Sequence, residues 1–512
     1  MSHTQFKGRA FLATGSLVAA AALMLAACAS PPVSAPSNPQ ATSASTSSDL
    51  EEFYGQVLDW RNCGQADCTT FEVPLDYENP EGQRVTLSMT RVSANGESIG
   101  SLFVNPGGPG GSAFDYAKAA DYIVTDQIRE SFDVVGVDPR GVGLSEPIDC
   151  LTDEQTDELI ASDASPDTEL EESRLILDAS VVGNACAGKN NPLIAHMSTV
   201  EVAKDMDIAR ALVGDPVMNM LGKSYGTSIA STYMQLFPQR VGRMVLDGVL
   251  PTYLDQLEVT RGQAEEFEIL LRYFIEDCLN NDDCPVSGTT DQGVKQLQEF
   301  LMKLDEQPLV NAEGRELTQA VAEYAILSYL YFPEYDFDEL RPALNDAMGN
   351  DDPDRLFTIL DQRISRGADG KYEDNSNDSF YAVSCLDLPV TETFDQIRQF
   401  AQELQVSAPT FGPSLAWGAT VCKDWPFQGI QPSAIQPGTS PPVMIVVTEN
   451  DPATPARWGK DLAQKLGNAE VVEWVGGYNH TAYNEGSECV TNTVDAFLLD
   501  GAINPGSTTA CD

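Results

Sequence analysis

The sequence predicts an α/β fold in which a mainly parallel sheet is flanked by helices. Short runs rich in β-branched residues alternate with longer segments of helical periodicity, the pattern of strands joined by helical crossovers. The chain has 512 residues, with 42% hydrophobic and 21% charged residues, which are ordinary values for a globular protein. This length accommodates one large domain with an insertion.

Seven runs are expected to be strands, and a helix is expected after the fourth and after the last of them. The strands are expected at 85–92, 101–105, 133–138, 217–222, 241–246, 443–447 and 471–475. The two helices are expected at 227–237, stopped by Pro238, and at 487–499.

The stretch between the fifth and sixth expected strands has helical patterns and no comparable series of strands. Those patterns lie at 264–279, 293–304, 317–330 and 394–404. Because this stretch is too long for a loop, it is expected to be a helical cap inserted into the fold. The expected division is a first core part at 50–251, the cap at 252–440 and a last core part at 441–512.

The first residues are expected to be an export signal. Lys7 and Arg9 precede an apolar run, so 1–27 is expected to be removed. The run ends in Leu-Ala-Ala-Cys, the shape of a bacterial lipobox, so Cys28 is expected to carry the lipid of a cell-envelope lipoprotein. Residues 28–49 are rich in Ser, Pro and Ala and are expected to form a flexible tether. No later run reaches the roughly 18 apolar residues of a membrane span, so the lipid is expected to be the only membrane attachment.

The charge of the chain excludes one class of partner. Asp and Glu number 77 against 30 Lys and Arg, a formal net charge of −47. Such a charge repels phosphate backbones, so no nucleic-acid partner is expected. It is typical of a well-solvated exported protein and would attract cationic groups such as free amino termini.

Cysteine usage predicts disulfides rather than a metal site. The chain has eleven cysteines, and setting Cys28 aside leaves ten, an even number. Short loops favour five pairs: Cys63 with Cys68, Cys150 with Cys186, Cys278 with Cys284, Cys385 with Cys422, and Cys489 with Cys511. Three histidines and no paired C-x-x-C spacing argue against zinc, so no metal is expected.

The strongest chemical signal is the sequence Gly-Lys-Ser-Tyr-Gly at 222–226, a G-x-S-x-G between an expected strand and an expected helix. A serine nucleophile must project from a sharp turn, and glycines two residues away on each side prevent clashes there. Ser224 is therefore the predicted nucleophile.

A serine hydroxyl needs a base, and the chain has only three histidines, His3, His196 and His480. His3 lies in the expected signal, and His196 precedes the serine in a helix-leading stretch, where a structural role is expected. His480 follows the last expected strand, where a loop can bring its imidazole over the serine. His480 is the predicted general base.

The predicted acid is Asp451, directly after the strand at 443–447, which gives the order Ser, Asp, His. Two competitors are Glu449, two residues away, and Asp247, after the strand that follows the nucleophile helix. Asp451 is preferred because the flanking prolines would hold it in one geometry.

The expected oxyanion hole combines the amide of Tyr225 with one from the loop Asn-Pro-Gly-Gly-Pro-Gly-Gly-Ser at 105–112. Gly108 is the preferred second donor and Gly107 the alternative. The loop lacks the G-K-[ST] ending of a phosphate-binding P-loop. No cofactor is expected for this chemistry.

Four landmarks in order resemble peptidase family S33, the proline iminopeptidase and tripeptidyl aminopeptidase group of α/β-hydrolases. They are the loop at 105–112, the Asp-Pro-Arg-Gly-Val-Gly-Leu-Ser turn at 138–145, the elbow at 222–226 and the Asp-Pro-Ala-Thr-Pro loop at 451–455. The resemblance spans roughly residues 53–511. It implies an α/β-hydrolase fold and a serine aminopeptidase that releases tripeptidyl or prolyl units through an acyl-enzyme.

The resemblance also implies a peptide substrate whose free amine is recognised by acidic residues of the cap. The candidates for that role are Glu265, Glu266, Glu268 and Asp387. One departure from the family pattern is Tyr478-Asn479 before His480, where many members have a shorter glycine-histidine turn.

Two other functions remain open from the sequence. A carboxylesterase or lipase would use the same three residues on the same scaffold. A non-catalytic surface-binding lipoprotein would not need the complete set of serine, aspartate and histidine. The sequence specifies no oligomeric state.

Overall fold

The computed structural model describes residues 50–512. The expected signal at 1–27, the expected lipid site Cys28 and the expected tether at 28–49 lie outside the described residues. Within the described part of the chain, no helix has the length and apolar character needed to cross a membrane.

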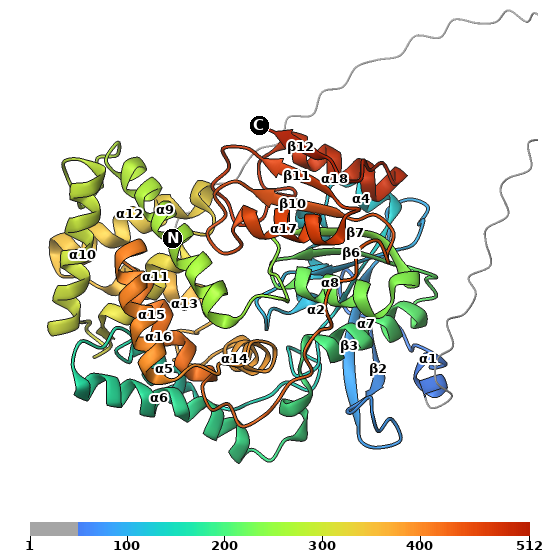
Figure 1. Ribbon diagram of the computed structural model, residues 1–512, viewed down its shortest axis with the longest axis horizontal. Coiled ribbons are helices and arrows are strands. Elements are labelled where there is room, and N and C mark those ends of the chain that lie inside the picture. The colour runs from blue at the N-terminus through green and yellow to red at the C-terminus, as the bar shows by residue number, and fades with distance from the viewer. Residues whose placement is uncertain (1–49) are drawn as a thin grey trace, which may run out of the picture. The chain divides into compact units, whose positions relative to one another are not determined.

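A ten-stranded sheet forms the centre of the described chain, in the order β1-β2-β3-β5-β4-β6-β7-β10-β11-β12 (Figure 1). The pairs from β1 to β5 along this order are antiparallel, and all pairs from β5 to β12 are parallel. The strands are β1 Arg61–Asn62, β2 Asp67–Pro74, β3 Arg84–Val92, β4 Ser101–Asn105, β5 Asp133–Val137, β6 Met218–Lys223, β7 Val241–Asp247, β10 Met444–Thr448, β11 Glu470–Trp474 and β12 Thr508–Cys511. The seven expected strands are all present to within two residues, and this is the α/β-hydrolase fold that the sequence predicts.

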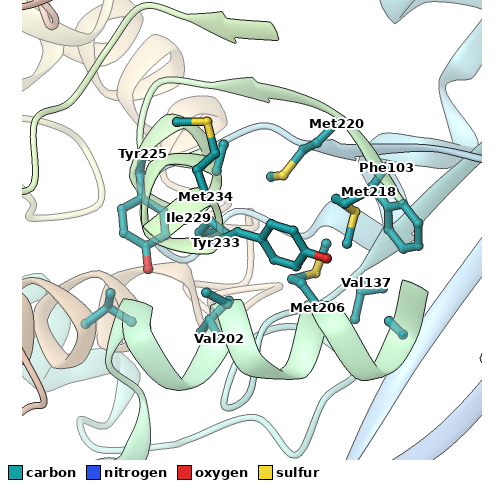
Figure 2. Close-up of a cluster of buried hydrophobic side chains, with 14 of the residues drawn as sticks. Phe103, Val137, Val202, Met206, Met218, Met220, Tyr225, Ile229, Tyr233 and Met234 are labelled. Carbon is teal, nitrogen blue, oxygen red and sulfur yellow. The ribbon is translucent and has the colours of Figure 1, made fainter. Parts of the chain in front are cut away.

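Helices cover both faces of the sheet, as the alternation along β4 requires. Phe103 packs into one buried cluster, whereas its neighbours Leu102 and Val104 pack into another on the opposite face. Figure 2 shows the first cluster between the strands and two helices. The helices on that face are α1 Glu51–Tyr54, α7 Thr199–Leu212, α8 Gly226–Leu236 and α17 Ala456–Leu466. Those on the other face are α2 Ala113–Lys118, α3 Ala120–Ile123, α4 Asp126–Ser131 and α18 Glu488–Asp500.

The stretch between β7 and β10 is helical, with one two-stranded hairpin that the sequence did not reveal. Its elements are α9 Gln256–Cys278, α10 Thr290–Glu306, β8 Leu309–Val310, β9 Glu316–Leu317, α11 Gln319–Ser328, α12 Pro333–Asn350, α13 Asp354–Arg363, α14 Ser376–Asp387, α15 Phe394–Ser407, α16 Gly412–Gly418 and the 3₁₀ turn η4 Ala419–Cys422. These elements contribute most of two buried clusters of their own. We call this stretch the cap.

Two helices that precede the nucleophile also pack against the cap. They are α5 Asp153–Ala161 and α6 Glu169–Gly188, and Figure 1 shows them beside α15 and α16. Leu175 of α6 lies in a buried cluster with cap residues, and Asp157 of α5 binds the guanidinium of Arg366 at 2.8 Å. The sequence placed this stretch in the first core part because periodicity identifies a helix but not its neighbour.

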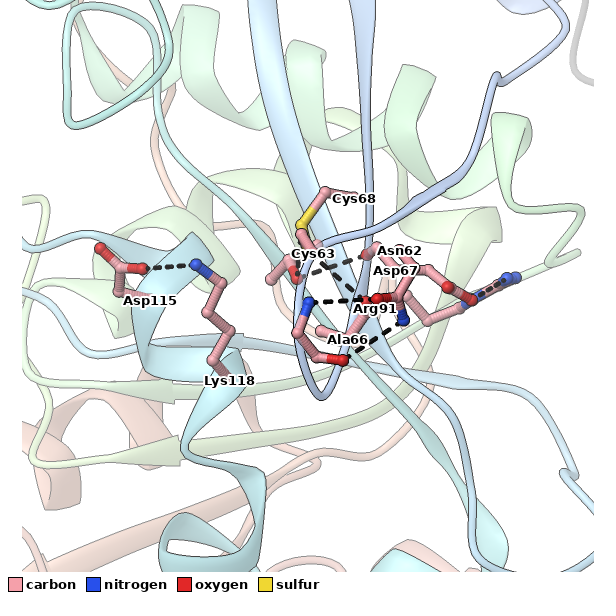
Figure 3. The surroundings of a disulfide bond; sticks show 10 residues. Asn62, Cys63, Ala66, Asp67, Cys68, Arg91, Asp115 and Lys118 are labelled. Carbon is pink, nitrogen blue, oxygen red and sulfur yellow. Dashed lines mark hydrogen bonds and ion pairs between the residues drawn. A yellow bond between two sulfur atoms is a disulfide. The ribbon is translucent and has the colours of Figure 1, made fainter.

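All five expected disulfides are present, and each joins the pair that loop length favoured. They join Cys63 to Cys68, Cys150 to Cys186, Cys278 to Cys284, Cys385 to Cys422, and Cys489 to Cys511. Figure 3 shows the first, which joins the residue after β1 to β2. Five disulfides indicate a protein that folds outside the cytoplasm.

A buried ion pair joins the turn after β5 to α7. The guanidinium of Arg140, fully buried, donates to both carboxylate oxygens of Asp205 at 2.7 and 2.6 Å. The remaining guanidinium hydrogens reach backbone carbonyls, including that of Leu75 at 2.8 Å, and the Tyr77 hydroxyl donates to Asp205 at 2.7 Å. The Arg of the Asp-Pro-Arg-Gly motif is therefore a structural residue.

Replacing Arg140 by Met is expected to lower the free energy of unfolding by about 3–5 kcal/mol, because Asp205 is left as a buried carboxylate without its cation. Urea unfolding followed by tryptophan fluorescence measures the change. The control is Arg61→Met, because Arg61 is an exposed partner of Asp59, and a change within about 0.5 kcal/mol is expected there. A loss below about 1 kcal/mol for Arg140→Met would contradict this account.

Candidate active site

Ser224 lies at the turn between β6 and α8 in the conformation expected of an activated nucleophile. Its φ is 54°, and its N–H donates to the carbonyl of Asp247 at 2.9 Å. A Cβ atom on Gly222 would lie 2.5 Å from the Gly226 carbonyl oxygen, and one on Gly226 would lie 2.7 Å from the Asn105 carbonyl oxygen. Both glycines of the motif are therefore required by close approach of backbone.

His480 lies in the loop after β11 and contacts the expected acid. Its Nδ1 is 2.8 Å from Oδ1 of Asp451, and both side chains are buried. Asp451 also accepts the amides of Ala453 and Thr454, and the Thr454 hydroxyl at 2.9 Å. The amide of Thr481 donates to Oδ2 at 3.1 Å. These bonds fix the carboxylate, so it can orient the imidazole for proton transfer.

The two competing acids have other roles. Asp247 accepts the amides of Ala482 and Tyr483, both at 2.9 Å, and burial raises its pKa to about 6. Glu449 is exposed and accepts the amide of Gly476. Each therefore binds the backbone of the histidine loop and not the imidazole.

Lys223, the variable residue before the serine, also holds this loop. Its buried ammonium donates to Oε1 of Glu485 at 2.8 Å and to the carbonyl of Tyr483 at 3.1 Å. The nucleophile turn and the histidine loop are thus joined by a charged hydrogen bond as well as by Asp247. A G-x-S-x-G pattern gives no hint of this contact, because it leaves that position unspecified.

The loop that carries the proposed second oxyanion donor packs on the amide of Tyr225. The amide of Gly107 already donates to Oδ1 of Asn105 at 2.9 Å, which disfavours Gly107 as the second donor. A Cβ on Gly107 would lie 2.9 Å from the amide nitrogen of Tyr225, so the loop packs directly on that amide. Gly108 lines the same cavity as Ser224. Gly108 and Tyr225 remain our proposed pair of donors.

A buried carboxylate holds the oxyanion loop in place. Asp138 accepts the hydroxyl of Ser112 at 2.8 Å and the amides of Phe114 and Leu144 at 2.9 Å. Burial raises its pKa above the ordinary value for aspartate. The loop at 105–112 and the turn at 138–145 therefore support each other, which explains why both motifs occur together.

A cavity of about 660 Å³ opens at Ser224 and is walled by the cap together with α5 and α6. Its volume lies within the range of small-molecule and peptide sites. The apolar wall includes Leu159, Leu175, Phe267, Tyr331, Phe380, Leu415 and Trp417. The ionisable side chains that line it are Asp163, Glu323 and Arg363, apart from tyrosines.

None of the four acids expected to bind a substrate amine lines this cavity, and these expectations are corrected by the contacts that each makes. Glu265 and Glu266 form ion pairs with Arg457. Glu268 accepts the amide and hydroxyl of Thr410, both at 3.0 Å, joining α9 to the segment before α16. The sequence of an acid-rich helix does not distinguish a carboxylate with a structural partner from one that binds a substrate amine.

The fourth, Asp387, caps α7 and stands outside the main cavity. It accepts the amide and hydroxyl of Thr199, at 2.9 and 2.5 Å. It lines a separate cavity of about 40 Å³ beside Tyr225, too small for a peptide.

Glu323 is the acid that the sequence did not single out. It is 3% exposed, its Oε1 accepts the side-chain amide of Gln319 at 2.7 Å, and burial raises its pKa to about 7. The available signal was a single acid inside the otherwise apolar helix α11, a position where an ionisable group is rarely placed without a partner.

His196 has the structural role that its position indicated. Its Nδ1 lies 2.7 Å from Oε1 of Glu201, and its carbonyl accepts a hydrogen bond from Arg140. Hydrogen bonding to Glu201 raises the pKa of His196 above its ordinary value.

The nucleophile elbow, the buried aspartate and the histidine after β11 define the protein as a serine hydrolase with the α/β-hydrolase fold. A family model described as "TAP-like protein" matches residues 408–511. The chain belongs to this TAP-like family of α/β-hydrolases.

Relatives along almost the whole chain support that placement. Serine protease Hip1 of Mycobacterium tuberculosis is 32% identical over 476 residues, covering 88% of this chain and 90% of that protein. Carboxylesterase B of the same species is 32% identical over 462 residues, covering 88% and 87%. Tripeptidyl aminopeptidase of Streptomyces coelicolor is 27% identical over 462 residues, covering 87% and 84%.

Replacing Asp451 by Asn is expected to lower kcat by about 10³–10⁴-fold, because the amide favours the wrong imidazole tautomer and cannot stabilise the cation. Turnover of an activated ester measures the loss. The matched control is Glu449→Gln, which keeps an acceptor for the Gly476 amide and is expected to retain kcat within about twofold. Equal losses in the two variants would contradict the assignment of the acid.

Proposed function

We propose that the protein is an exported serine aminopeptidase that removes N-terminal residues or short tripeptidyl or prolyl units from peptides. The observation that carries the proposal is the cavity at Ser224, which the cap closes over and which contains the buried carboxylate of Glu323. A chamber of this kind suits a chain end rather than the middle of a polypeptide. The relatives named as serine protease and tripeptidyl aminopeptidase support the same reading.

The proposed reaction is acyl transfer in two steps. His480 takes the proton of the Ser224 hydroxyl as its oxygen attacks the scissile carbonyl, and Asp451 stabilises the resulting imidazolium. The amides of Gly108 and Tyr225 bind the oxyanion of the tetrahedral intermediate. The imidazolium then protonates the departing amine. Water, activated by His480, releases the acyl group from Ser224.

We propose that Glu323 binds the free amine of the substrate. An ammonium group would add a positive charge beside the carboxylate, whose hydrogen-bond donor Gln319 is neutral. Asp163 lines the same cavity and adds negative potential. The positive charge of Arg363 offsets this negative potential only in part, because its guanidinium already pairs with Asp336 at 2.5 Å.

A carboxylesterase is the second candidate function. One relative carries that name, and the cavity wall near Ser224 is largely aromatic and aliphatic, which would also accept an acyl chain. The two functions differ in whether the substrate needs a charged amine.

We further propose that the protein is a cell-envelope lipoprotein attached through a lipid on Cys28. The lipobox-like sequence supports this, and the disulfides are those of a protein folded outside the cytoplasm. Metabolic labelling with a fatty-acid analogue tests it: label is expected on the wild type and absent from Cys28→Ser.

Free-amine tripeptide and prolyl chromogens are expected to be cleaved, and their acetylated forms at least about tenfold more slowly, because acetylation removes the charge that Glu323 would bind. A fluorophosphonate probe is expected to label the wild type and not Ser224→Ala, which loses cleavage as well. Ester turnover with every free-amine chromogen left intact would reject the aminopeptidase and favour the esterase.

Replacing Glu323 by Gln is expected to lower kcat/KM for free-amine peptides about 10–100-fold and to leave ester turnover nearly unchanged. In the wild type, the ratio of kcat/KM for a free-amine peptide to that for an ester should rise as the pH increases through about 7, the pKa of Glu323, because Glu323 ionises there. The ratio cancels every pH dependence that the two substrates share. It should be flat in Glu323→Gln, and Glu265→Gln, a surface carboxylate, should behave as wild type.

A further inference from the structure

The loop that carries His480 is held from two sides, by the core and by the cap. On the core side, the amide of Asn450 donates to the Gly477 carbonyl at 3.0 Å. On the cap side, the amide of His480 donates to the Tyr331 carbonyl at 2.8 Å. The backbone of the histidine itself is therefore bound by a cap residue.

An aromatic stack provides the second cap contact. The ring of Tyr478, two residues before the histidine, lies 3.9 Å from the ring of Tyr273 on α9, with an interplanar angle of 10°. Tyr273 in turn contacts Phe337 of α12 at 5.8 Å between centroids, and Phe337 meets Phe274 edge-on at 4.9 Å. Tyr478 thus extends an aromatic row of the cap, and it packs against the buried cluster of the cap.

Tyr331 meets the imidazole directly as well as through its carbonyl. Its ring lies 5.3 Å from the His480 ring at an angle of 87°, and 5.4 Å from Phe267 on α9. Edge-on aromatic contacts of this kind favour one ring orientation. The imidazole therefore packs against cap residues on this side, while Asp451 contacts its Nδ1.

The core-side hydrogen bonds before the histidine are made to the backbone of two glycines, Gly476 and Gly477. Gly476 has a φ of 71°, a conformation that favours glycine, and neither glycine has a side chain that could anchor the loop. Asp451 binds Nδ1 and the amide of Thr481, so it holds the ring and the backbone after the histidine rather than the residues before it. Proton transfer from Ser224 is sensitive to displacements of about 1 Å. Tyr478, between the glycines and His480, anchors the loop to the cap through its stack on Tyr273.

We propose that Tyr478 is a positioning residue, whose stack on Tyr273 of the cap fixes the histidine loop so that His480 faces Ser224. The proposal rests on the assignment of His480 as the general base and is independent of which acyl substrate the cavity takes. It also assigns a use to the residues by which the chain departs from the shorter glycine-histidine turn of the family.

Replacing Tyr478 by Ala is expected to lower kcat about 10–100-fold with KM within about twofold, because substrate binding is unaffected and the base is misplaced. The rate of labelling by a fluorophosphonate probe should fall by the same factor. Tyr478→Phe keeps the stacked ring and should restore both rates to within about twofold of the wild type. Tyr478→Leu, which keeps apolar bulk without a stacking plane, should lie between Ala and Phe and serves if the alanine variant does not fold.

A double-mutant cycle separates positioning from general loss of stability. Tyr273→Ala should cause the same loss in kcat as Tyr478→Ala, and the double variant should lose little more. The matched control is Phe300→Leu on α10, a buried residue of the same cap cluster, which should lower the melting temperature and leave the labelling rate unchanged.

A folded Tyr478→Ala protein that is labelled and turns over esters at the wild-type rate would overturn the proposal. So would a loss confined to KM, or a loss that Tyr478→Phe does not restore. Because the probe and the esters need no charged amine, these outcomes are distinct from a failure of the aminopeptidase assignment, which shows as intact free-amine chromogens.

Discussion

The buried contact between Asp451 and His480 forms only if the histidine loop after β11 is held in place against the acid loop after β10 and the nucleophile turn after β6. Most of the hydrogen bonds around the site hold the histidine loop in this position. Asp247 and Lys223, both on the nucleophile side, bind the backbone after the histidine, and Glu449 and Asn450, on the acid side, bind the backbone before it. Buried charges that would be costly alone are satisfied by this loop.

The sequence was most informative where chemistry demands a residue type at a set distance from a strand end. The elbow, the acid and the base follow from strand ends at 222, 447 and 475, and scarcity of histidine removed most alternatives. The pairing of the ten cysteines was likewise predicted by loop length, because each cysteine lies within 37 residues of its partner. The strands β1, β2 and β12 of the sheet were missed, since they are short or partly polar and their pairing comes from the neighbouring strand.

The substrate chamber could not be predicted in the same way. Its walls come from helices whose periodicity reveals an apolar stripe but not which neighbour covers it, as α5 and α6 show. The four acids chosen from the sequence lie in helices and have structural partners: two form ion pairs, one accepts hydrogen bonds from Thr410, and one caps α7. Glu323 is marked in the sequence only as the single acid of the otherwise apolar helix α11, and its place at the cavity is set by the packing of the surrounding helices.

Because α5 and α6 line the chamber, the wall around the substrate is assembled from both sides of the nucleophile in the chain. The cap is therefore not a self-contained module. Exchanging only residues 252–440 between two members of the family would join one protein's helices to the other's Leu159, Leu175 and Asp157, and with them a foreign half of the wall. A transplant of specificity has to carry the stretch 153–188 as well, so changes in these two distant segments are constrained to occur together.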